Sequence, residues 1–427
     1  MSSSIIWEDG RVFLSDSLAL PFFETLAKPY SGYYHLIPRL VAEVASPSNL
    51  LAVPRLYILC SIIFSACVLA LPVLNIFDNL MRTPWRIGYV MLCAVIPVPL
   101  EILGNITCLH WYAFWGLMLL CLADLRSLRP GWLLIMIPYA FITVFSSPPT
   151  IILVPLAIVQ VVLHRHNKCV IVFDASVVVF CAAFFLLCSS LNKAVSLPSG
   201  SDMLLFVAQT GGFKSVMEPA VGRDIALAYL QNPKVSILAF TLLLVAVFAF
   251  AFRLLRHGSA KKSVLLLSIV YAIIAPLVLA GITRPNYIEH FVRDRTFSGA
   301  DRYFAVPVFL FLLLLVQGIS AGLRRFPMVI RIALLAVMLL LYSIPVVQNF
   351  RYGIPDPAKY NWRADVIEYY QAVVRSREST VKATPWTISI YPGDGWCVSL
   401  PSPTSFTEPE RQRIDKVLAR CEPSRSF

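Results

Sequence analysis

Two neighbouring stretches decide what kind of fold this chain has: VSILAFTLLLVAVFAFAF at 235–252 and SVLLLSIVYAIIAPLVLAGI at 263–282. Neither stretch contains a charged residue. A helix needs about 20 mainly apolar residues to cross about 30 Å of hydrocarbon. Both stretches are close to that length, so the sequence predicts two helices that cross a membrane.

Similar segments fill much of the remaining chain, although some carry prolines or polar residues, and two (111–123 and 149–163) are short. The candidate spans are 53–74, 87–104, 111–123, 131–146, 149–163, 169–191, 235–252, 263–282, 303–322 and 329–348. The whole 427-residue chain is 58% hydrophobic and only 14% charged, whereas an average soluble domain is roughly 45–50% apolar and about 25% charged. This composition excludes a soluble globular enzyme, a disordered protein and a disulfide-rich secreted module. We therefore expect an all-α polytopic membrane protein with about ten transmembrane helices.

Basic residues concentrate in alternate loops between these segments, which explains most of the +12 net charge without nucleic acid as a partner. The residues are Arg82, Arg86, Arg126, Arg129, Arg165, Lys168, Arg253, Arg256, Lys261, Lys262, Arg324, Arg325 and Arg331. Because cytoplasmic loops are enriched in Lys and Arg, we place these loops in the cytoplasm. The loops 192–234 and 284–302 are then extracytoplasmic.

Three regions follow from this orientation. Residues 1–52 form an extracytoplasmic loop with juxtamembrane helices, 53–348 form the transmembrane domain, and 349–427 form an extracytoplasmic cap. An N-terminal segment on the outer side must be translocated across the membrane. We therefore expect either one more helix before Met1 in the full-length gene product or direct translocation of the tail.

The N-terminal region contains two amphipathic patterns. Within 36–44, apolar residues form one helical stripe, while His35, Arg39 and Glu43 recur every four positions on another face. This pattern is typical of a helix lying in the membrane surface, and Arg39 and Glu43 are spaced for an ion pair. Residues 14–27 predict a second surface helix up to or around Pro21.

The C-terminal region predicts a small α+β cap. A helix is expected over 363–375, strands over 386–391 and 396–400 around the turn 393–395, and a helix capped by Thr407 up to Arg420. Cys397 and Cys421 are the only cysteines in the cap, so an oxidising compartment would allow a disulfide between them. No Cys/His spacing typical of a zinc site occurs.

Polar residues that could carry chemistry gather in the parts assigned to the outer face. They form four groups: the acid pair at 8–9, the aromatic and basic run at 29–39, the residues at 101–111 where the second span ends and the third begins, and the arginine-rich loop at 284–303. The candidate catalytic residues are Asp9 and Glu8, and the candidate substrate-binding residues are Tyr33, Tyr34, His35, Arg39, Glu101, Asn105, His110, Arg284, Arg293, Arg295 and Arg302.

The four loop arginines run against the positive-inside bias, and an anion near the outer surface would explain them. Guanidinium groups bind phosphate through paired hydrogen bonds, and a carboxylate can deprotonate an acceptor hydroxyl. These parts suit transfer of a group from a lipid phosphate. Simpler interpretations stay open: lipid headgroup contact or internal pairing for the arginines, an interfacial position for Glu101, and a solvated turn for the acid pair.

The arrangement resembles the GT-C superfamily of integral-membrane glycosyltransferases. The similarity rests on the acidic Glu8-Asp9, on the juxtamembrane region 14–46 and on the many spans. The runs EDGRVFL (8–14), PYSGYYHLIPRL (29–40) and GNITCLHWY (104–112) are also similar to bacterial membrane proteins of this architecture. One departure is that no transmembrane helix precedes the acidic motif here.

The resemblance implies an enzyme in the bacterial cytoplasmic membrane with its active site facing the exterior. The donor would be a polyprenyl-phosphate-linked sugar, transferred with inversion to a glycan, lipid or protein acceptor of the cell envelope. Asp9 would be the general base, Glu8 an acceptor or metal contact, and the loop arginines would hold the lipid phosphate. No cofactor is certain, and a divalent metal stays an option. A lipid-linked glycan polymerase or ligase, a transporter or flippase, and a scaffold without catalysis are the alternatives.

Overall fold

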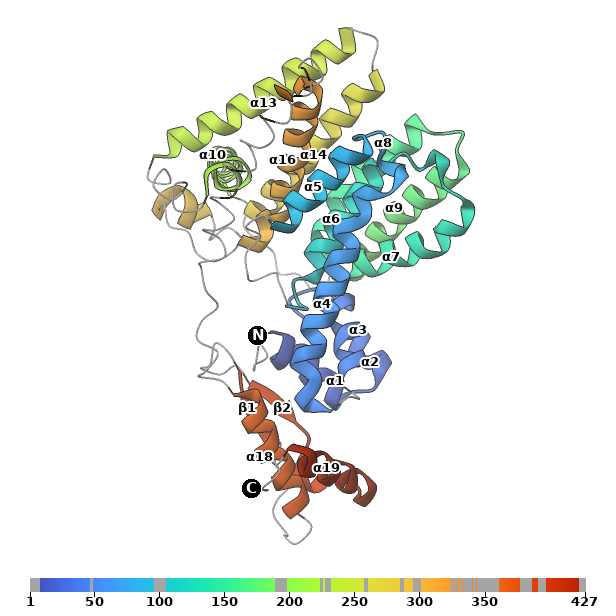
Figure 1. Cartoon of the computed structure of the whole chain (residues 1–427), viewed down its shortest axis with the longest axis vertical. Coiled ribbons are helices and arrows are strands. Elements are labelled where there is room, and N and C mark those ends of the chain that lie inside the picture. The colour runs from blue at the N-terminus through green and yellow to red at the C-terminus, as the bar shows by residue number, and fades with distance from the viewer. Residues whose placement is uncertain are drawn as a thin grey trace.

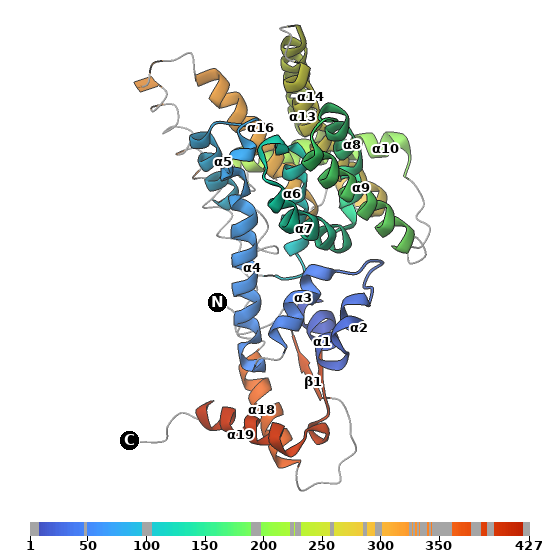
Figure 2. The same cartoon turned by 90° about the vertical axis from the view of Figure 1, so that its right-hand side faces the viewer.

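The computed structural model of the chain is mainly helical. It describes 8–46, 49–95, 105–188, 198–222, 232–256, 260–284, 288–294, 301–323, 361–376, 386–390 and 397–421, with single positions 226, 327, 329, 330, 333, 340 and 343. Within these residues, an upper helical bundle stands above a smaller lower body, and α4 (Val53–Ala70) runs from one to the other (Figures 1 and 2).

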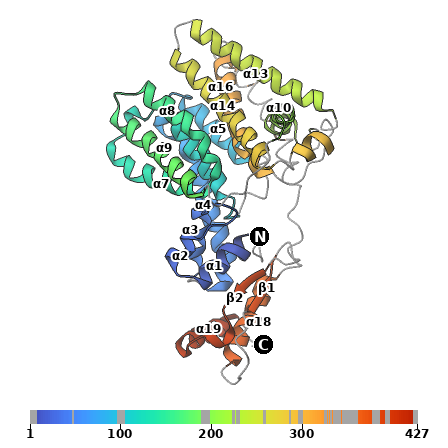
Figure 3. The same cartoon turned by 180° about the vertical axis from the view of Figure 1, so that it is seen from behind.

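The bundle contains most of the apolar helices. In chain order its elements are α5 (Thr83–Val95), α6 (Leu109–Leu122), α7 (Leu133–Ser146), α8 (Leu153–Leu163), α9 (Lys168–Cys188), α10 (Gly200–Thr210), α11 (Glu218–Val221), α13 (Pro233–Arg256), α14 (Ala260–Thr283) and α16 (Ala305–Leu323). Short 3-10 turns join them at η3 (Leu71–Val73), η4 (Asn75–Phe77), η5 (Leu125–Ser127), η6 (Pro130–Trp132), η7 (Pro148–Ile152) and η11 (Asp301–Phe304), and π-helical turns form η9 (Gly211–Met217) and η10 (Glu289–Asp294). Seen from behind, α7, α8 and α9 form one side of the bundle, while α10, α13, α14 and α16 form the other (Figure 3).

Four helical stretches of the described chain are long and apolar enough to cross a membrane: 50–73, 168–188, 262–283 and 302–320. Large apolar side chains stand exposed on all four, most strongly on α4 and α9, for example Ile62 and Leu186. Exposed apolar surface of this kind marks contact with a partner or a membrane. These helices agree with four predicted spans, but the total of about ten is not confirmed. The predicted span 329–348 lies almost wholly outside the described residues.

Two segments differ from the sequence prediction. The expected spans 131–146 and 149–163 form α7 and α8, which have 14 and 11 residues and are bent by 117° at their junction. A span needs about 20 residues, and each of these helices is shorter. Only the two helices together are long enough to count as one candidate span. The predicted outer loop 192–234 is also partly helical, because it contains α10, η9 and α11.

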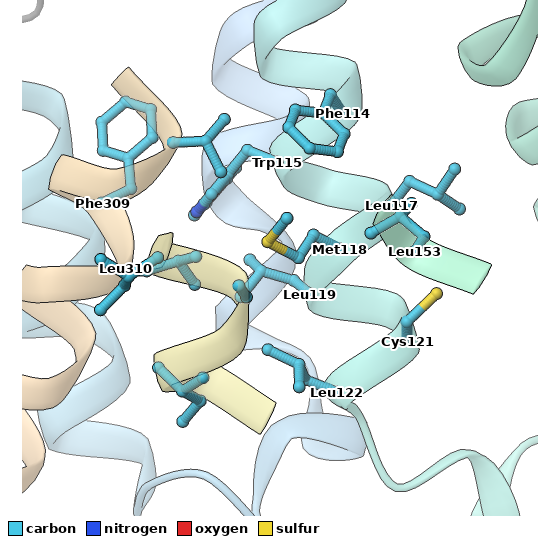
Figure 4. Packing of buried hydrophobic residues seen from close by; sticks show 14 of the residues in the cluster. Phe114, Trp115, Leu117, Met118, Leu119, Cys121, Leu122, Leu153, Phe309 and Leu310 are labelled. Atoms are coloured by element: carbon cyan, nitrogen blue, oxygen red, sulfur yellow. The ribbon is translucent and has the colours of Figure 1, made fainter. Parts of the chain in front are cut away.

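α6 lies at the centre of the bundle. Every one of its 14 residues is buried, and it packs against α4, α7, α8, α14 and α16. Figure 4 shows Trp115, Met118 and Leu119 among the side chains of its neighbours, including Phe309 of α16. A helix that is apolar all round lies either in a protein core or in lipid, and α6 is enclosed by protein along its whole length.

The contact between η9 and α13 depends on Gly212. A Cβ atom added at this residue would lie 1.7 Å from the backbone carbonyl oxygen of Ser236 on α13. No side chain fits in that space, so glycine permits the close approach of the two helices.

The lower body joins the two ends of the chain. Its N-terminal part holds η1 (Asp9–Leu14), α1 (Ser15–Ala19), α2 (Phe22–Ala27), α3 (Leu36–Ala45) and η2 (Leu50–Ala52). Its C-terminal part holds α18 (Trp362–Arg375), β1 (Trp386–Ser389), β2 (Cys397–Leu400), η13 (Pro403–Ser405) and α19 (Glu408–Cys421). The indole of Trp362 donates to the Leu50 carbonyl at 2.8 Å, and Leu50 N–H donates to the Tyr370 hydroxyl at 3.1 Å. One hydrophobic core runs through both parts, so the cap is docked on the N-terminal region.

The C-terminal cap agrees closely with its sequence prediction. β1 and β2 pair antiparallel, with Trp386 opposite Leu400 and Ser389 opposite Cys397. α19 begins after Thr407, whose N–H and hydroxyl both donate to the Glu410 carboxylate. The predicted disulfide is absent, because Cys397 is a free thiol. It sits at the start of β2, whereas α19, which ends at Cys421, packs on α18.

The amphipathic helix α3 turns its polar face into the protein. On the polar face, Arg39 is fully buried and His35 nearly so, while Val44 of the apolar stripe is 70% exposed. On the neighbouring α2, Phe23 is 80% exposed. The predicted Arg39–Glu43 ion pair does not form, because Arg39 instead pairs with Asp16 of α1. The exposed side of α2 and α3 therefore carries apolar side chains, which is typical of helices that lie in a membrane surface.

Candidate functional site

Asp9 lies against the N-terminal turn that leads into α6. One carboxylate oxygen accepts the N–H and the hydroxyl of Thr107, at 2.9 and 2.5 Å, and the other accepts the N–H of Ile106 at 2.9 Å. The side chain is only 2% exposed. Burial raises the pKa of Asp9 to about 7, although these three hydrogen bonds favour the charged form. A carboxyl group with this pKa exchanges protons near neutral pH.

The turn at 105–107 is built to receive this carboxylate. The Asn105 side chain accepts the Thr107 N–H at 2.8 Å, and His110 Nδ1 donates to the Thr107 carbonyl at 2.5 Å. Unpaired N–H groups at a helix N-terminus attract anions. The predicted site residues Asp9, Asn105 and His110 therefore lie together, as the first turn of the central helix brings them together.

Aromatic rings and histidines form the next layer, which we call the ring cluster: Phe13, Tyr30, Tyr33, His35 and His110. The Tyr33 and His35 rings stack with centroids 3.6 Å apart, and His110 lies 6.1 Å from His35, edge to face. Burial lowers the pKa of His35 well below its usual value and raises that of Tyr33, so both rings are neutral at physiological pH.

The backbone before α3 is folded tightly to present these rings. Tyr30 and Tyr33 pair across a turn in which Ser31 has φ 53° and Gly32 has φ 92°. His35 also adopts the left-handed conformation, with φ 54°. Non-glycine residues in this region cost free energy and occur often at functional sites.

Two of the four predicted loop arginines meet at Tyr303, whose ring packs against Trp111, the neighbour of His110 in the ring cluster. Arg284 Nε donates to the Tyr303 hydroxyl at 3.2 Å, and the Arg302 guanidinium lies 5.6 Å from the centre of the Tyr303 ring. Both positive charges act on Tyr33. Burial and the charge of Glu8 raise the pKa of Tyr30, whereas the charge of Arg302 lowers it. The acid pair and these arginines therefore border one group of rings, although 275 to 293 positions separate Asp9 from them in the chain.

The remaining predicted site residues lie elsewhere or outside the described residues. Tyr34 packs near Phe145, with ring centroids 6.0 Å apart. Glu101 and Arg295 fall outside the described residues, and the side chain of Arg293 is likewise not described. Within the described chain, no group of three or more His, Cys, Asp or Glu side chains could hold a metal ion. A metal contact by Glu8 stays a prediction.

Arg39 belongs to the framework of the site. Its Nη1 donates to Asp16 at 2.9 Å, its Nε donates to the Tyr34 carbonyl at 3.1 Å, and its guanidinium lies over the Phe13 ring. Lys28 pairs with the same carboxylate from outside, and its side chain is 50% exposed. These contacts tie α1, α2 and α3 together beneath the ring cluster.

This arrangement predicts unequal effects for the two cations. Arg39→Met should lower the free energy of unfolding by about 3 kcal/mol, since it breaks a buried ion pair. Lys28→Ala should lower it by no more than about 1 kcal/mol, as exposed pairs contribute little. Thermal unfolding of the purified protein in detergent measures both. Equal stability of Arg39→Met and wild type would show that Arg39 has no framework role and would favour substrate binding.

Three residues of this neighbourhood were not predicted from sequence. Thr107 holds Asp9, Asp16 holds Arg39, and Tyr303 joins the two arginines. Thr107 carried a usable signal, because it stands at the start of an apolar helix where N–H groups are unpaired. The Asp16–Arg39 and Arg284–Tyr303 pairings connect segments whose proximity only the fold creates.

No protein-family model matches the chain, and neither does any curated protein or solved structure. The fold alone therefore defines its class. It is a mostly helical protein with several helices suited to a membrane and a small two-stranded sheet near its C-terminus.

Proposed function

We propose that this chain is a membrane glycosyltransferase of the GT-C type, which moves a sugar from a polyprenyl-phosphate carrier to a cell-envelope acceptor. The observation that supports this most is the meeting of the acid pair and two arginines at the ring cluster. Such a transfer needs a base that deprotonates the acceptor hydroxyl and cations that stabilise the phosphate leaving group.

The proposed reaction assigns each group a step. Asp9 takes the proton of the acceptor hydroxyl, whose oxygen bonds to the anomeric carbon of the sugar. The bond between that carbon and the carrier phosphate breaks, and its electron pair stays on the phosphate oxygen. Arg302 and Arg284 stabilise the departing negative charge. A carboxylate has about four acceptor positions, and the protein uses three on Asp9, which leaves one for a hydroxyl.

The ring cluster would form the walls of the sugar site. Tyr33 and His35 are neutral and stacked, so they offer flat surfaces without competing for the proton that Asp9 accepts. Neutral aromatic faces suit the apolar faces of sugar rings. We therefore assign Tyr33, His35 and His110 to the donor or acceptor sugar.

The proposal places the lower body at the outer membrane surface. The exposed Phe22, Phe23 and Val44 of α2 and α3 would enter the lipid interface, as expected of surface-lying helices. The same proposal includes a chain with about ten spans in the bacterial cytoplasmic membrane, with its active site facing the exterior.

A transporter or flippase is the second candidate, and one observation favours it. Asp174 of α9 is buried, and neither of its carboxylate oxygens has a hydrogen-bond partner within the described residues. Buried acids in membrane helices mark ion or substrate paths. The bent α7–α8 pair packs on the same helix, and discontinuous helices are typical of transporters.

Deletion of the gene, with mass analysis of envelope glycans and lipid-linked sugars, tests the proposed function. The glycosyltransferase predicts loss of one sugar and accumulation of its lipid-linked donor. Shortened or unattached glycan chains would support a polymerase or ligase. An unchanged set of glycans with altered solute uptake would support a transporter and contradict the proposal.

A further inference from the structure

A polar cavity lies at the end of α6 opposite to the Asp9 site. Its volume is about 180 Å³, and it is lined by Asn79, Ala123, Asp124, Arg126, Gln160, Leu163, His164, Lys262, Val264, Leu265 and Ser268. α6 has 14 residues, which at 1.5 Å each make about 21 Å. Asp9 contacts the turn before this helix, whereas Ala123 and Asp124 follow its last residue. The cavity is therefore separate from the candidate glycosyl-transfer site.

The charged residues of this cavity leave an excess of positive charge. Asp124 accepts hydrogen bonds from Arg126 Nε, at 2.7 Å, and from Arg126 Nη2, so this pair neutralises itself. Lys262 stands in the first turn of α14 and makes no ion pair with any described residue. The N-terminus of a helix carries a partial positive charge that adds to that of the lysine.

Neutral donors are also available in the cavity. The side chains of Gln160 and Ser268 form no hydrogen bond within the described part of the chain, although both line the cavity. Gln160 is the polar residue of an otherwise apolar α8. An amide, a hydroxyl and an ammonium group that converge without protein partners fit an oxyanion better than a cation.

The size and surroundings of the cavity indicate where this anion comes from. Small-molecule sites usually have about 300–1,000 Å³, so this cavity holds a headgroup-sized part of a ligand. Next to the lining residues, Val162 of α8 is 66% exposed and Leu267 of α14 is 36% exposed. These apolar side chains would contact lipid chains on either side of the opening.

We propose that this cavity binds the phosphate group of an anionic phospholipid, with Lys262, Gln160 and Ser268 as its ligands. The phosphate would lie at the α14 N-terminus, and the acyl chains would run along α8 and α14. This proposal is independent of sugar transfer, since none of its residues belongs to the Asp9 site.

The test is thermal unfolding of the whole purified protein in detergent with added phosphatidylglycerol, combined with native mass spectrometry of retained lipid. Phosphatidylglycerol should raise the Tm, whereas phosphatidylcholine should not. Lys262→Ala should reduce the rise at least twofold and remove one bound lipid. Lys234→Ala is the matched control, because Lys234 is also exposed and stands in the first turn of α13, at the opposite end of the α13–α14 hairpin.

Three outcomes would overturn the proposal. Equal loss of the Tm rise in Lys234→Ala would show that the lipid effect is general. An unchanged rise in Lys262→Ala would exclude this cavity. An equal rise with inorganic phosphate alone would assign the site to a free anion instead of a lipid. A Gln160→Leu variant repeats the test with the surface charge unchanged, and it too should lose the bound lipid.

Discussion

Asp9→Asn should reduce sugar transfer by about 10²–10⁴-fold, the range expected for loss of a general base. The asparagine keeps the size of the side chain but cannot accept the proton of the acceptor hydroxyl. The measurement is release of polyprenyl phosphate by purified protein in liposomes that contain the lipid-linked donor identified by the gene deletion. Transfer at the wild-type rate would exclude Asp9 as the base.

The pH dependence of kcat/KM is a second test of Asp9 as the general base. The base acts in its charged form, and burial raises the pKa of Asp9 to about 7. The value of kcat/KM should therefore rise about tenfold per pH unit below pH 7 and level off above it. A flat profile between pH 5 and 8 would contradict this assignment.

Thr107→Val provides a control that separates chemistry from folding. The Thr107 hydroxyl bond lowers the pKa of Asp9, so its loss should move the profile to higher pH while activity at high pH is retained. If Asp9 only holds the α6 turn in place, Thr107→Val should instead lose stability and activity together, with no change in the profile.

Gly212→Ala should have the largest effect on folding. The added methyl would lie 1.7 Å from the Ser236 carbonyl oxygen, which is backbone and cannot rotate away. Overpacking usually costs about 1–3 kcal/mol and occasionally more. We expect more than about 3 kcal/mol here, because η9 and α13 must separate. Thermal unfolding and the yield of folded protein from membranes measure this effect.

Gly88→Ala is the matched control for this prediction. Gly88 lies within α5, and an added Cβ there would meet no atom within 4 Å. Alanine is favoured over glycine in a helix by about 1 kcal/mol, so this variant should be as stable as wild type or more stable. Similar unfolding temperatures for the two variants would show that η9 does not touch α13 as described.

Local patterns predicted the parts of the fold that are decided locally. The strands of the cap and the start of α19 after Thr407 follow from turn and helix-start residues within a few positions. The long apolar helices α9 and α14 follow from high hydrophobicity sustained over about 20 residues. The bend between α7 and α8 could not be predicted in this way, because apolar length alone does not distinguish two short spans from one broken one.

The candidate site was predictable in its parts but not in its contacts. The sequence marked Asp9, His110 and Arg302 by residue type. It paired Arg39 with Glu43 through helix spacing, yet the structure pairs it with Asp16, because α3 turns its polar face inward onto α1. Asp9 and Thr107 are 98 positions apart, and only the placement of η1 beside the turn before α6 brings them into contact.

The most direct measurement of the central claim is the donor dependence of the initial transfer rate for Arg302→Ala beside Asp9→Asn. If both groups border one substrate site, Arg302→Ala should raise KM for the lipid-linked donor at least tenfold, and Asp9→Asn should lower kcat with little change in KM. Wild-type kcat and KM in Arg302→Ala, next to an inactive Asp9→Asn, would contradict a shared site.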